Sequence, residues 1–265
     1  MKITKTLCAA CVVAALSAVS ALAGALEKDT LIVGTNATYP PYEFRAKDGS
    51  LQGYDVDLIE AIGKKLGKKI QWQDTAFDGL LPAVLTGKID IIAAGMSATP
   101  KRREKVAFSG PTNKSAHVIF VKAGSPLNSE AAFKGKVLGV QMGTIQEAYA
   151  MAHMPDTTTK PYKSSADCFF DVVYGRLDGT LISASSGYSY ATSKDFKGKV
   201  AVACVVEEMT KNANPTAFAM SKKDPELLAA VDTCLEELKA SGKFQALRDK
   251  WGLDDWKKLL VPFQQ

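Results

Sequence analysis

Segments with a strand-like pattern of hydrophobic residues alternate with segments that have a helical spacing along most of the chain. Residues 31–33, 70–73 and 89–94 are short strand-like runs. Between them, residues 55–66 and 77–85 carry apolar side chains at helical spacing. The order strand, helix, strand, helix, strand predicts a parallel sheet covered by helices.

A second block of the chain repeats this order. The predicted elements are strands at 137–140 and 177–182 and helices over 146–153 and 166–174. Residues 86–90 and 174–178 also match locally. In each, a glycine ends a helix, a basic residue follows, and an apolar residue and an aspartate open a strand. Such junctions are common in α/β proteins, so the repeat alone gives only moderate support for two lobes of one plan.

The C-terminal part returns to helices, predicted over 225–241 and 244–251. No linker rich in proline, glycine or serine separates the two blocks. We therefore expect crossing strands, residues 118–121 outward and 216–220 back, to join two Rossmann-like lobes. The predicted division is lobe 1 over 24–116 and 215–265, and lobe 2 over 117–214. A cleft between hinged α/β lobes is a preferred place for a ligand.

The N-terminal residues form a separate unit. Two lysines precede an apolar run at residues 7–22, which ends in the small residues Ala21 and Ala23. This pattern is typical of a cleaved signal peptide over residues 1–23. A short membrane anchor is disfavoured because the run is short and no charge stops it. A lipoprotein is disfavoured because the early cysteines lie inside the run. We expect a soluble, periplasmic mature protein.

Composition narrows the class further. With 46% hydrophobic and 23% charged residues, the chain is not collagen-like, disordered or a coiled coil. The net charge of +5 is spread without a basic block, so nucleic acid is not an expected partner. Export would place Cys168, Cys204 and Cys234 in an oxidising compartment. Three cysteines allow at most one bridge, and the sequence leaves the pair open.

The first candidate binding segment is residues 95–103. Thr99 and Pro100 predict a helix start, and three cations follow in its first turn. Cations oppose the helix dipole there. An arginine beside free backbone N–H groups suits a carboxylate or a phosphate, which makes Arg102 a candidate anchor. A solvated basic turn is the alternative.

The second candidate segment is residues 141–147. Gln141 ends a strand, Gly143 allows a close approach of the backbone, and Thr144 caps the next helix. Such a turn could share a small anion with the first segment across the cleft. An ordinary capped helix is the alternative.

The third candidate segment is residues 36–44. Its two prolines rigidify a loop that begins near Asn36, and the ring of Tyr39 could line one wall of a ligand site. Phe77, at the head of the next helix, could add a second aromatic face. The alternative is a loop packed on its own sheet.

Catalytic patterns are scarce. His117 and His153 are the two histidines, and no cysteine or histidine spacing suggests zinc. A nucleophile elbow and a phosphate loop are also missing from the sequence. Residues 183–186 form a hydroxyl cluster to which no histidine base can be assigned. We predict no catalytic residue, no metal and no cofactor, and each histidine is interpreted as a surface or packing residue.

Taken together and in order, these segments resemble the polar amino-acid family of extracytoplasmic solute-binding proteins. The matching residues are 31–35, 39–44, 53–58, 77–83, 87–90, 95–102, 108–109, 143–144 and 224–228. The resemblance implies a periplasmic binding protein of type II, in which two α/β lobes close over a small ligand. It also implies a monomer that delivers the ligand to an ABC permease in the inner membrane.

The resemblance also implies roles for individual residues. It assigns the ligand's α-carboxylate to Gly95, Ser97, Arg102, Gly143 and Thr144. It places the ligand's side chain between the rings of Tyr39 and Phe77. The predicted ligand-binding set is Asn36, Tyr39, Phe77, Gly95, Ser97, Arg102, Gln141, Gly143, Thr144 and Ser183.

The chain departs from the family pattern at Gly110 to Thr112, where Asp-Pro-Tyr is common, and at two positions that bear on the ligand's amino group. Ser183 stands where the family usually has an aspartate that holds the α-ammonium, and Asn36 stands where an acid is frequent. Either the ligand lacks a free α-amino group, or another acid reaches it. We expect a binding protein for a carboxylate-bearing, amino-acid-like solute. A periplasmic cyclohexadienyl-type dehydratase on the same scaffold is the alternative, with Glu43 or Glu147 as its general acid.

Overall fold

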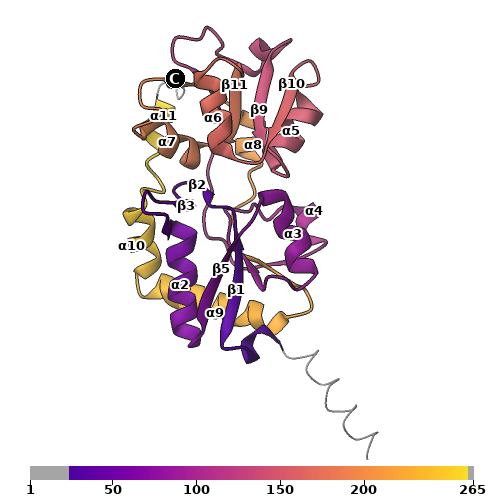
Figure 1. Ribbon diagram of the computed structural model, residues 1–265, viewed down its shortest axis with the longest axis vertical. Coiled ribbons are helices and arrows are strands. Elements are labelled where there is room, and N and C mark those ends of the chain that lie inside the picture. Colours follow the sequence, from indigo (N-terminus) through magenta and orange to yellow (C-terminus); the bar gives the residue numbers. More distant parts are fainter. Residues whose placement is uncertain (1–23, 262–265) are drawn as a thin grey trace, which may run out of the picture.

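The computed structural model describes residues 24–261, which form two lobes stacked along the long axis of the molecule (Figure 1). Lobe 1 is built on a five-stranded sheet in the order β5-β1-β6-β13-β7, and lobe 2 on a sheet in the order β10-β9-β11-β8-β12. The predicted two-lobed α/β class is confirmed. The predicted signal peptide, residues 1–23, lies outside the described residues.

Lobe 1 follows the predicted alternation. Its strands are β1 (Thr30–Thr35), β5 (Lys69–Asp74), β6 (Ile91–Ile92), β7 (Ala107–Phe108) and β13 (Ala219–Met220). Its helices are η2 (Ala25–Glu27), α2 (Tyr54–Leu66), α3 (Phe77–Leu85), α4 (Pro100–Arg103), α9 (Pro225–Ala240) and α10 (Lys243–Lys250). β1 pairs in parallel with β5 and β6, while β13 is antiparallel to its two neighbours. The apolar faces of α2 and α9 pack over this sheet in one core.

Lobe 2 repeats the plan. Its strands are β8 (His117–Lys122), β9 (Val137–Gln141), β10 (Thr158–Tyr162), β11 (Gly179–Ser183) and β12 (Val200–Val205). Its helices are η3 (Glu130–Phe133), α5 (Ile145–His153), α6 (Ser165–Val173), α7 (Ala184–Thr192) and α8 (Glu207–Lys211). β9 is parallel to β10 and β11, so their carboxyl ends meet at one edge of the sheet. Figure 1 shows that edge above lobe 1.

A small antiparallel sheet lies between the lobes, where the sequence predicted only a loop. It consists of β2 (Thr38–Tyr39), β3 (Glu43–Arg45) and β4 (Leu51–Gln52), and pairs Tyr39 with Glu43. Gly53 holds it against α2. A Cβ atom at Gly53 would lie 2.0 Å from the carbonyl oxygen of Tyr42, and its φ of +141° also favours glycine.

The outward crossing lies a few residues earlier than predicted, whereas the return passes through Thr216, the first residue of its predicted range. Residues 118–121 belong to β8 within the sheet of lobe 2, and the returning chain has already reached β13 by Ala219. The crossing segments instead pair with each other at Asn113 and Thr216. The prediction was wrong for residues 118–121 because a buried apolar run looks the same in a sheet and in a crossing.

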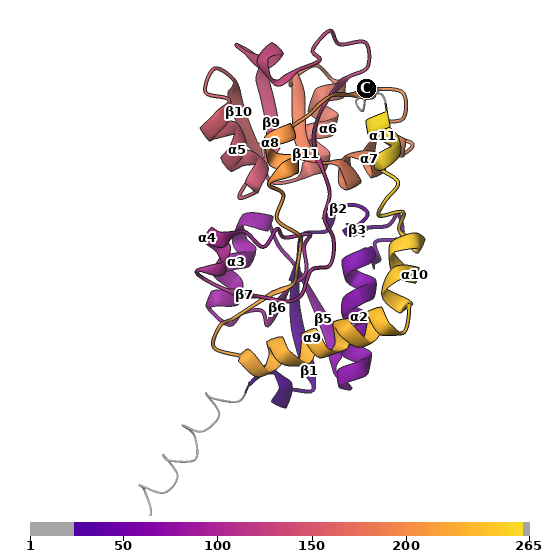
Figure 2. The same cartoon turned by 180° about the vertical axis from the view of Figure 1, so that it is seen from behind.

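A third connection joins the lobes at the C-terminus. The chain leaves α10 on lobe 1 and ends in α11 (Lys257–Leu260) against α7 of lobe 2 (Figure 2). Leu260 is buried in the apolar cluster of lobe 2, with Trp256 packed against it. The expectation that residues 215–265 all belong to lobe 1 is therefore wrong for this last segment. Its few apolar residues carry no signal that distinguishes the two lobes.

The buried cysteines remain unbridged. Cys168, Cys204 and Cys234 are all free thiols, so none of the possible pairs forms. Within residues 24–261, no helix is both long enough and apolar enough to span a membrane. Over the same range, no group of three acidic, histidine or cysteine side chains is arranged to hold a metal ion.

Candidate functional site

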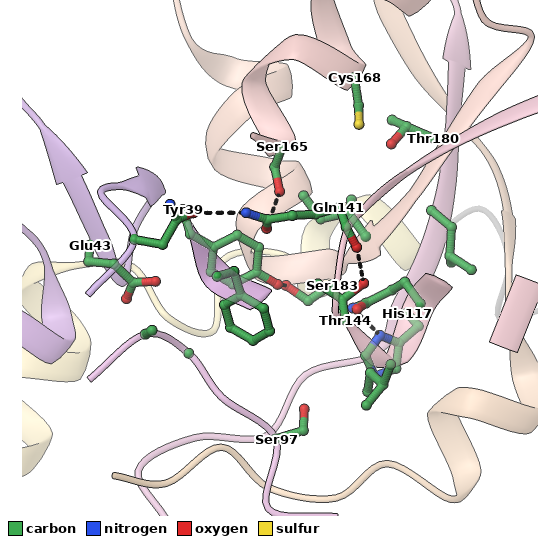
Figure 3. Close-up of a pocket in the computed structure, with 18 of the residues that line it drawn as sticks. Tyr39, Glu43, Ser97, His117, Gln141, Thr144, Ser165, Cys168, Thr180 and Ser183 are labelled. Carbon is green, nitrogen blue, oxygen red and sulfur yellow. Dashed lines mark hydrogen bonds between the residues drawn. The ribbon is translucent and has the colours of Figure 1, made fainter. Parts of the chain in front are cut away.

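A pocket lies between the lobes and draws its walls from both (Figure 3). The predicted residues that line it are Asn36, Tyr39, Phe77, Gly95, Ser97, Arg102, Gln141, Thr144 and Ser183. They come from the carboxyl ends of β1, β5, β6, β9 and β11 and from the segments that follow these strands, where ligands bind in open α/β sheets. Gly143 does not line the pocket directly, but its carbonyl oxygen contacts Arg102.

Arg102 is the cation of this pocket. Thr99 begins α4 and accepts a hydrogen bond from the backbone N–H of Arg102 at 3.3 Å, which fixes the turn. The guanidinium donates to the carbonyl of Ser97 at 2.9 Å and to that of Gly143, on the other lobe, at 3.0 Å. It also lies 5.5 Å from the centre of the Phe77 ring. Burial lowers the pKa of Arg102 to about 10, so the side chain stays charged at neutral pH.

The other two cations of this turn point elsewhere. Lys101 is exposed, and the guanidinium of Arg103 lies over the ring of Phe108 at 5.2 Å. Moreover, α4 has only four residues, so its dipole is small. The helix dipole therefore contributes little at this turn, and the burial of Arg102 is what distinguishes it.

The turn after β9 is capped as predicted. Thr144 accepts a hydrogen bond from the backbone N–H of Glu147 at 3.2 Å and donates to the carbonyl of Gln141 at 2.6 Å. The carboxylate of Glu147 accepts the N–H of Gly143 at 2.7 Å. The predicted anion-binding N–H of Gly143 is thus already paired within its own turn, whereas Thr144 remains on the pocket wall.

The two departures from the family pattern make neutral contacts between the lobes. Asn36 accepts a hydrogen bond from Gln141 at 2.8 Å, and Ser183 pairs with the hydroxyl of Tyr39 at 2.6 Å (Figure 3). Since the Arg102 contact also crosses the cleft, the lobes are closed on each other. Asn36 and Ser183 thus hold the closed form together without charge.

Two buried acids stand behind and beside the pocket. Asp55 accepts the backbone N–H of Gly95 at 2.9 Å, and burial raises the pKa of its carboxyl to about 7. Glu43 lines the pocket itself and is 1% exposed. Neither of its carboxylate oxygens has a hydrogen-bond partner among residues 24–261. Burial raises the pKa of Glu43 well above its ordinary value, and the nearby charges of Asp55 and Asp74 add to this.

The sequence indicated Glu43 only as a possible general acid. No local signal marks it, because burial falls steadily along β3 from Glu43 to Arg45 instead of alternating. Its burial also depends on the closing contact of Gly53, which no local pattern reveals.

A further group of pocket residues was missed. His117 lines the pocket from β8, where burial lowers the pKa of its imidazole to about 4 and keeps it neutral. Gln146 contacts His117 Nδ1 at 3.2 Å, and Ser165 donates to Gln141 at 2.9 Å. The interpretation of His117 as a packing residue is thus incomplete. Across the described part of the chain, its ring has no hydrogen bond to Ser183, so these two do not form a nucleophile and base pair.

The fold, the hinge and the buried arginine agree with one family. Residues 31–254 match the family described as bacterial extracellular solute-binding proteins, family 3. The chain belongs to this family. Among family 3 relatives, the arginine-binding extracellular protein ArtP of Bacillus subtilis (strain 168) is 32% identical over 251 residues, which cover 92% of this chain and 95% of ArtP.

Solved structures agree with this membership. An ancestral arginine-binding protein bound to arginine has a TM-score of 0.79 at 33% identity, covering 84% of this chain and 98% of that one. The ancestral amino acid-binding protein AncCDT-1, a precursor of cyclohexadienyl dehydratase, has a TM-score of 0.78 at 34% identity, covering 85% of this chain and 96% of that one. At this identity the family 3 likeness extends beyond the fold to the sequence.

Proposed function

We propose that this protein is the extracytoplasmic binding component of an amino-acid importer, and that the cleft binds an amino acid through its α-carboxylate on Arg102. The observation that carries the proposal is a buried, charged guanidinium that contacts both lobes. Arginine has five N–H donors, and the two carbonyl contacts use two of them. The remaining donors suit a carboxylate, which accepts two parallel hydrogen bonds.

Binding and closure form one process in this proposal. A ligand held by Arg102 of lobe 1 and Thr144 of lobe 2 interacts with both lobes only when they are closed. Differential affinity for the closed form therefore shifts the equilibrium toward it. The closed form then presents a joint surface of both lobes to an ABC permease, and the protein acts as a monomer in the periplasm after loss of residues 1–23.

The relatives favour a basic amino acid. ArtP is named as arginine-binding, and the ancestral protein with TM-score 0.79 holds arginine. Other relatives are named for L-cystine, and an ancestral arginine-binding protein is also solved bound to glutamine. All of these ligands carry an α-amino group, which supports the interpretation in which another acid replaces the aspartate missing at Ser183.

Binding without turnover is proposed over dehydration. AncCDT-1 is an amino acid-binding protein that precedes a dehydratase, and its likeness to this chain supports the older, binding function. Glu147 is partly exposed, and its carboxylate is paired with the N–H of Gly143 in its own turn. It is therefore a poor general acid for a ligand in the pocket.

Isothermal titration of the purified protein with the proteinogenic amino acids tests the proposal. We expect one group of related amino acids to bind, and the Arg102→Ala variant to bind them at least about 100-fold more weakly, because two charge-assisted hydrogen bonds are lost. Lys101→Ala, which removes the exposed neighbouring cation, should bind like the wild type. Undiminished affinity in Arg102→Ala would reject the site. Conversion of a cyclohexadienyl acid by the same samples would support the dehydratase.

A further inference from the structure

A chain of hydrogen bonds runs from helix α10 through the hinge to lobe 2. Arg248 of α10 donates through Nη1 to the side-chain oxygen of Asn113 at 2.7 Å. The amide nitrogen of Asn113 donates to the hydroxyl of Tyr42 at 2.5 Å, and that hydroxyl donates to Oγ of Ser185 at 3.1 Å. Ser185 lies in the first turn of α7, so the last bond crosses from lobe 1 to lobe 2. These four residues are outside the wall of the ligand pocket.

The charge of Arg248 fixes the direction of every bond in this chain. A guanidinium can only donate, so the side-chain oxygen of Asn113 must face it and the amide N–H must face Tyr42. The oxygen of Tyr42 then accepts, and its proton is left to point at Ser185. Asn113, Tyr42 and Ser185 are each at most 5% exposed, so an unpaired polar group there is costly. Because its acceptor belongs to lobe 2, the hydroxyl of Tyr42 loses that bond when the lobes separate.

The hinge end of the chain is held firmly. Asn113 belongs to the outward crossing, and its backbone carbonyl accepts the N–H of Thr216, on the return crossing, at 2.8 Å. The hydroxyl of Tyr54 and Nη1 of Arg248 donate to the carbonyl of Thr112 at 3.0 and 3.4 Å. Both crossings are therefore fixed relative to α10 at the point where they leave lobe 1.

Arg248 also holds the third connection between the lobes. Its Nη2 donates to the carboxylate of Asp254 at 3.0 Å. Leu253 belongs to the core of lobe 1, whereas Trp256 packs on lobe 2, so the chain changes lobes within three residues (Figure 2). Three residues span at most about 11 Å when fully extended, which leaves little slack as the lobes move apart. One guanidinium thus contacts both the hinge and this short connection.

We propose that Arg248 is a latch residue that favours the closed form of the protein from outside the ligand pocket. It orders Asn113 and Tyr42 so that the last hydrogen bond of the chain forms with lobe 2, and it fixes the C-terminal connection on the lobe 1 side. A larger closed population raises the apparent affinity for a ligand that needs closure. Arg248 therefore sets how tightly the cleft binds without selecting what it binds. The effect on affinity rests on the proposed function, whereas the effect on lobe separation does not.

The test removes the two ends of the chain in lobe 1. Arg248→Met keeps the stem without the donors, and Tyr42→Phe keeps the ring without the hydroxyl. Single-molecule energy transfer between dyes on the two lobes measures lobe separation without ligand, and isothermal titration measures the affinity for L-arginine. We expect each variant to shift the separation toward the open form and to bind L-arginine about 5-fold more weakly. Lys250→Met is the matched control, because it breaks an exposed ion pair of α10 with Asp57 inside lobe 1, and it should behave like the wild type.

The double variant shows whether the two residues act through one chain. If they do, its loss of affinity stays below about 10-fold, because the second substitution removes a bond that is already lost, whereas independent effects multiply to about 25-fold. Independent effects overturn the inference, and so does a wild-type separation and affinity in Arg248→Met. If L-arginine does not bind the wild type, the lobe separation alone is the test, and an unshifted separation in Arg248→Met overturns the inference.

Two further outcomes are kept apart. If no amino acid binds the wild type, the proposed function fails, while the separation measured without ligand still supports or overturns the latch. Should Arg248→Met not fold, Ser185→Ala removes the acceptor on lobe 2 and leaves lobe 1 unchanged. It should reproduce the shift seen in Tyr42→Phe, and a wild-type separation there overturns the inference.

Discussion

Two buried acids of lobe 1 show how a single residue can work against stability. Asp55 keeps one hydrogen bond, to the N–H of Gly95, while its other oxygen is unpaired within residues 24–261. Glu43 has no partner in the same range. A fold that keeps such groups beside a cleft fits a binding function better than a purely structural role, since binding sites are where perturbed acids gather.

The Asp55→Asn variant should change how stability depends on pH. Burial raises the pKa of Asp55 to about 7 in the folded protein, against about 3.9 when unfolded. The unfolded chain therefore binds fewer protons between these values, and the wild type loses stability as pH rises through that window. Relative to the wild type, Asp55→Asn should gain up to about 4 kcal/mol in free energy of unfolding between pH 4 and pH 8.

Urea unfolding at pH 4, 6 and 8 measures this difference. The packing cost of the added amide is the same at every pH, so only the change across pH matters. Asp195→Asn, at an exposed aspartate, should run parallel to the wild type. If Asp55→Asn also runs parallel, the carboxyl of Asp55 titrates normally and its burial carries no electrostatic cost.

At the level of elements, the C-terminal segment is the unexpected part. It leaves lobe 1 at α10 and packs α11 on lobe 2, so it must adjust whenever the cleft opens. Leu260 contributes a buried side chain to that contact, while its neighbour Val261 is 61% exposed.

Leu260→Ala should lower the free energy of unfolding by about 2 kcal/mol, because a buried leucine leaves a cavity. It should also speed proteolysis in residues 251–256, which connect the two lobes. Val261→Ala is the matched control and should change neither quantity. Wild-type stability and cleavage in Leu260→Ala would show that α11 is not held on lobe 2 in solution.

The elements that could be predicted from the sequence are those whose apolar residues recur at a regular spacing. α2, α3 and α9 follow from their apolar spacing, and each begins within one residue of its predicted start. α7 was missed because residues 184–192 are rich in serine and lack a helical apolar period, so packing on lobe 2 decides their conformation. β10 was missed because it is a half-exposed edge strand that contains Pro161.

In the candidate site, too, some residues could be placed from the sequence and others could not. Arg102, Thr144 and Ser183 lie next to turn and cap signals, which place them at strand ends or helix starts from the order of residues. Glu43 and His117 acquire their position through pairing in the small sheet and in β8, and their burial through closure of the lobes. Those are contacts between distant segments, and no local pattern encodes them.

For the whole molecule, three hydrogen bonds between the lobes hold the pocket closed. The hydrogen bonds from Tyr39 to Ser183 and from Gln141 to Asn36 cross the cleft near the ligand site, and the Arg102 contact to Gly143 crosses it at another point. All three are short-range, so they form only when the lobes meet. A ligand that pairs with Arg102 of lobe 1 and contacts Thr144 of lobe 2 adds contacts to this closed form and stabilises it further.

The most direct measurement is a crystal structure of the protein bound to the amino acid that titrates most tightly. We predict that the ligand's α-carboxylate lies within hydrogen-bond distance of the Arg102 guanidinium, with both lobes closed around it. A ligand bound outside the cleft, or one whose carboxylate faces away from Arg102, would contradict the central claim.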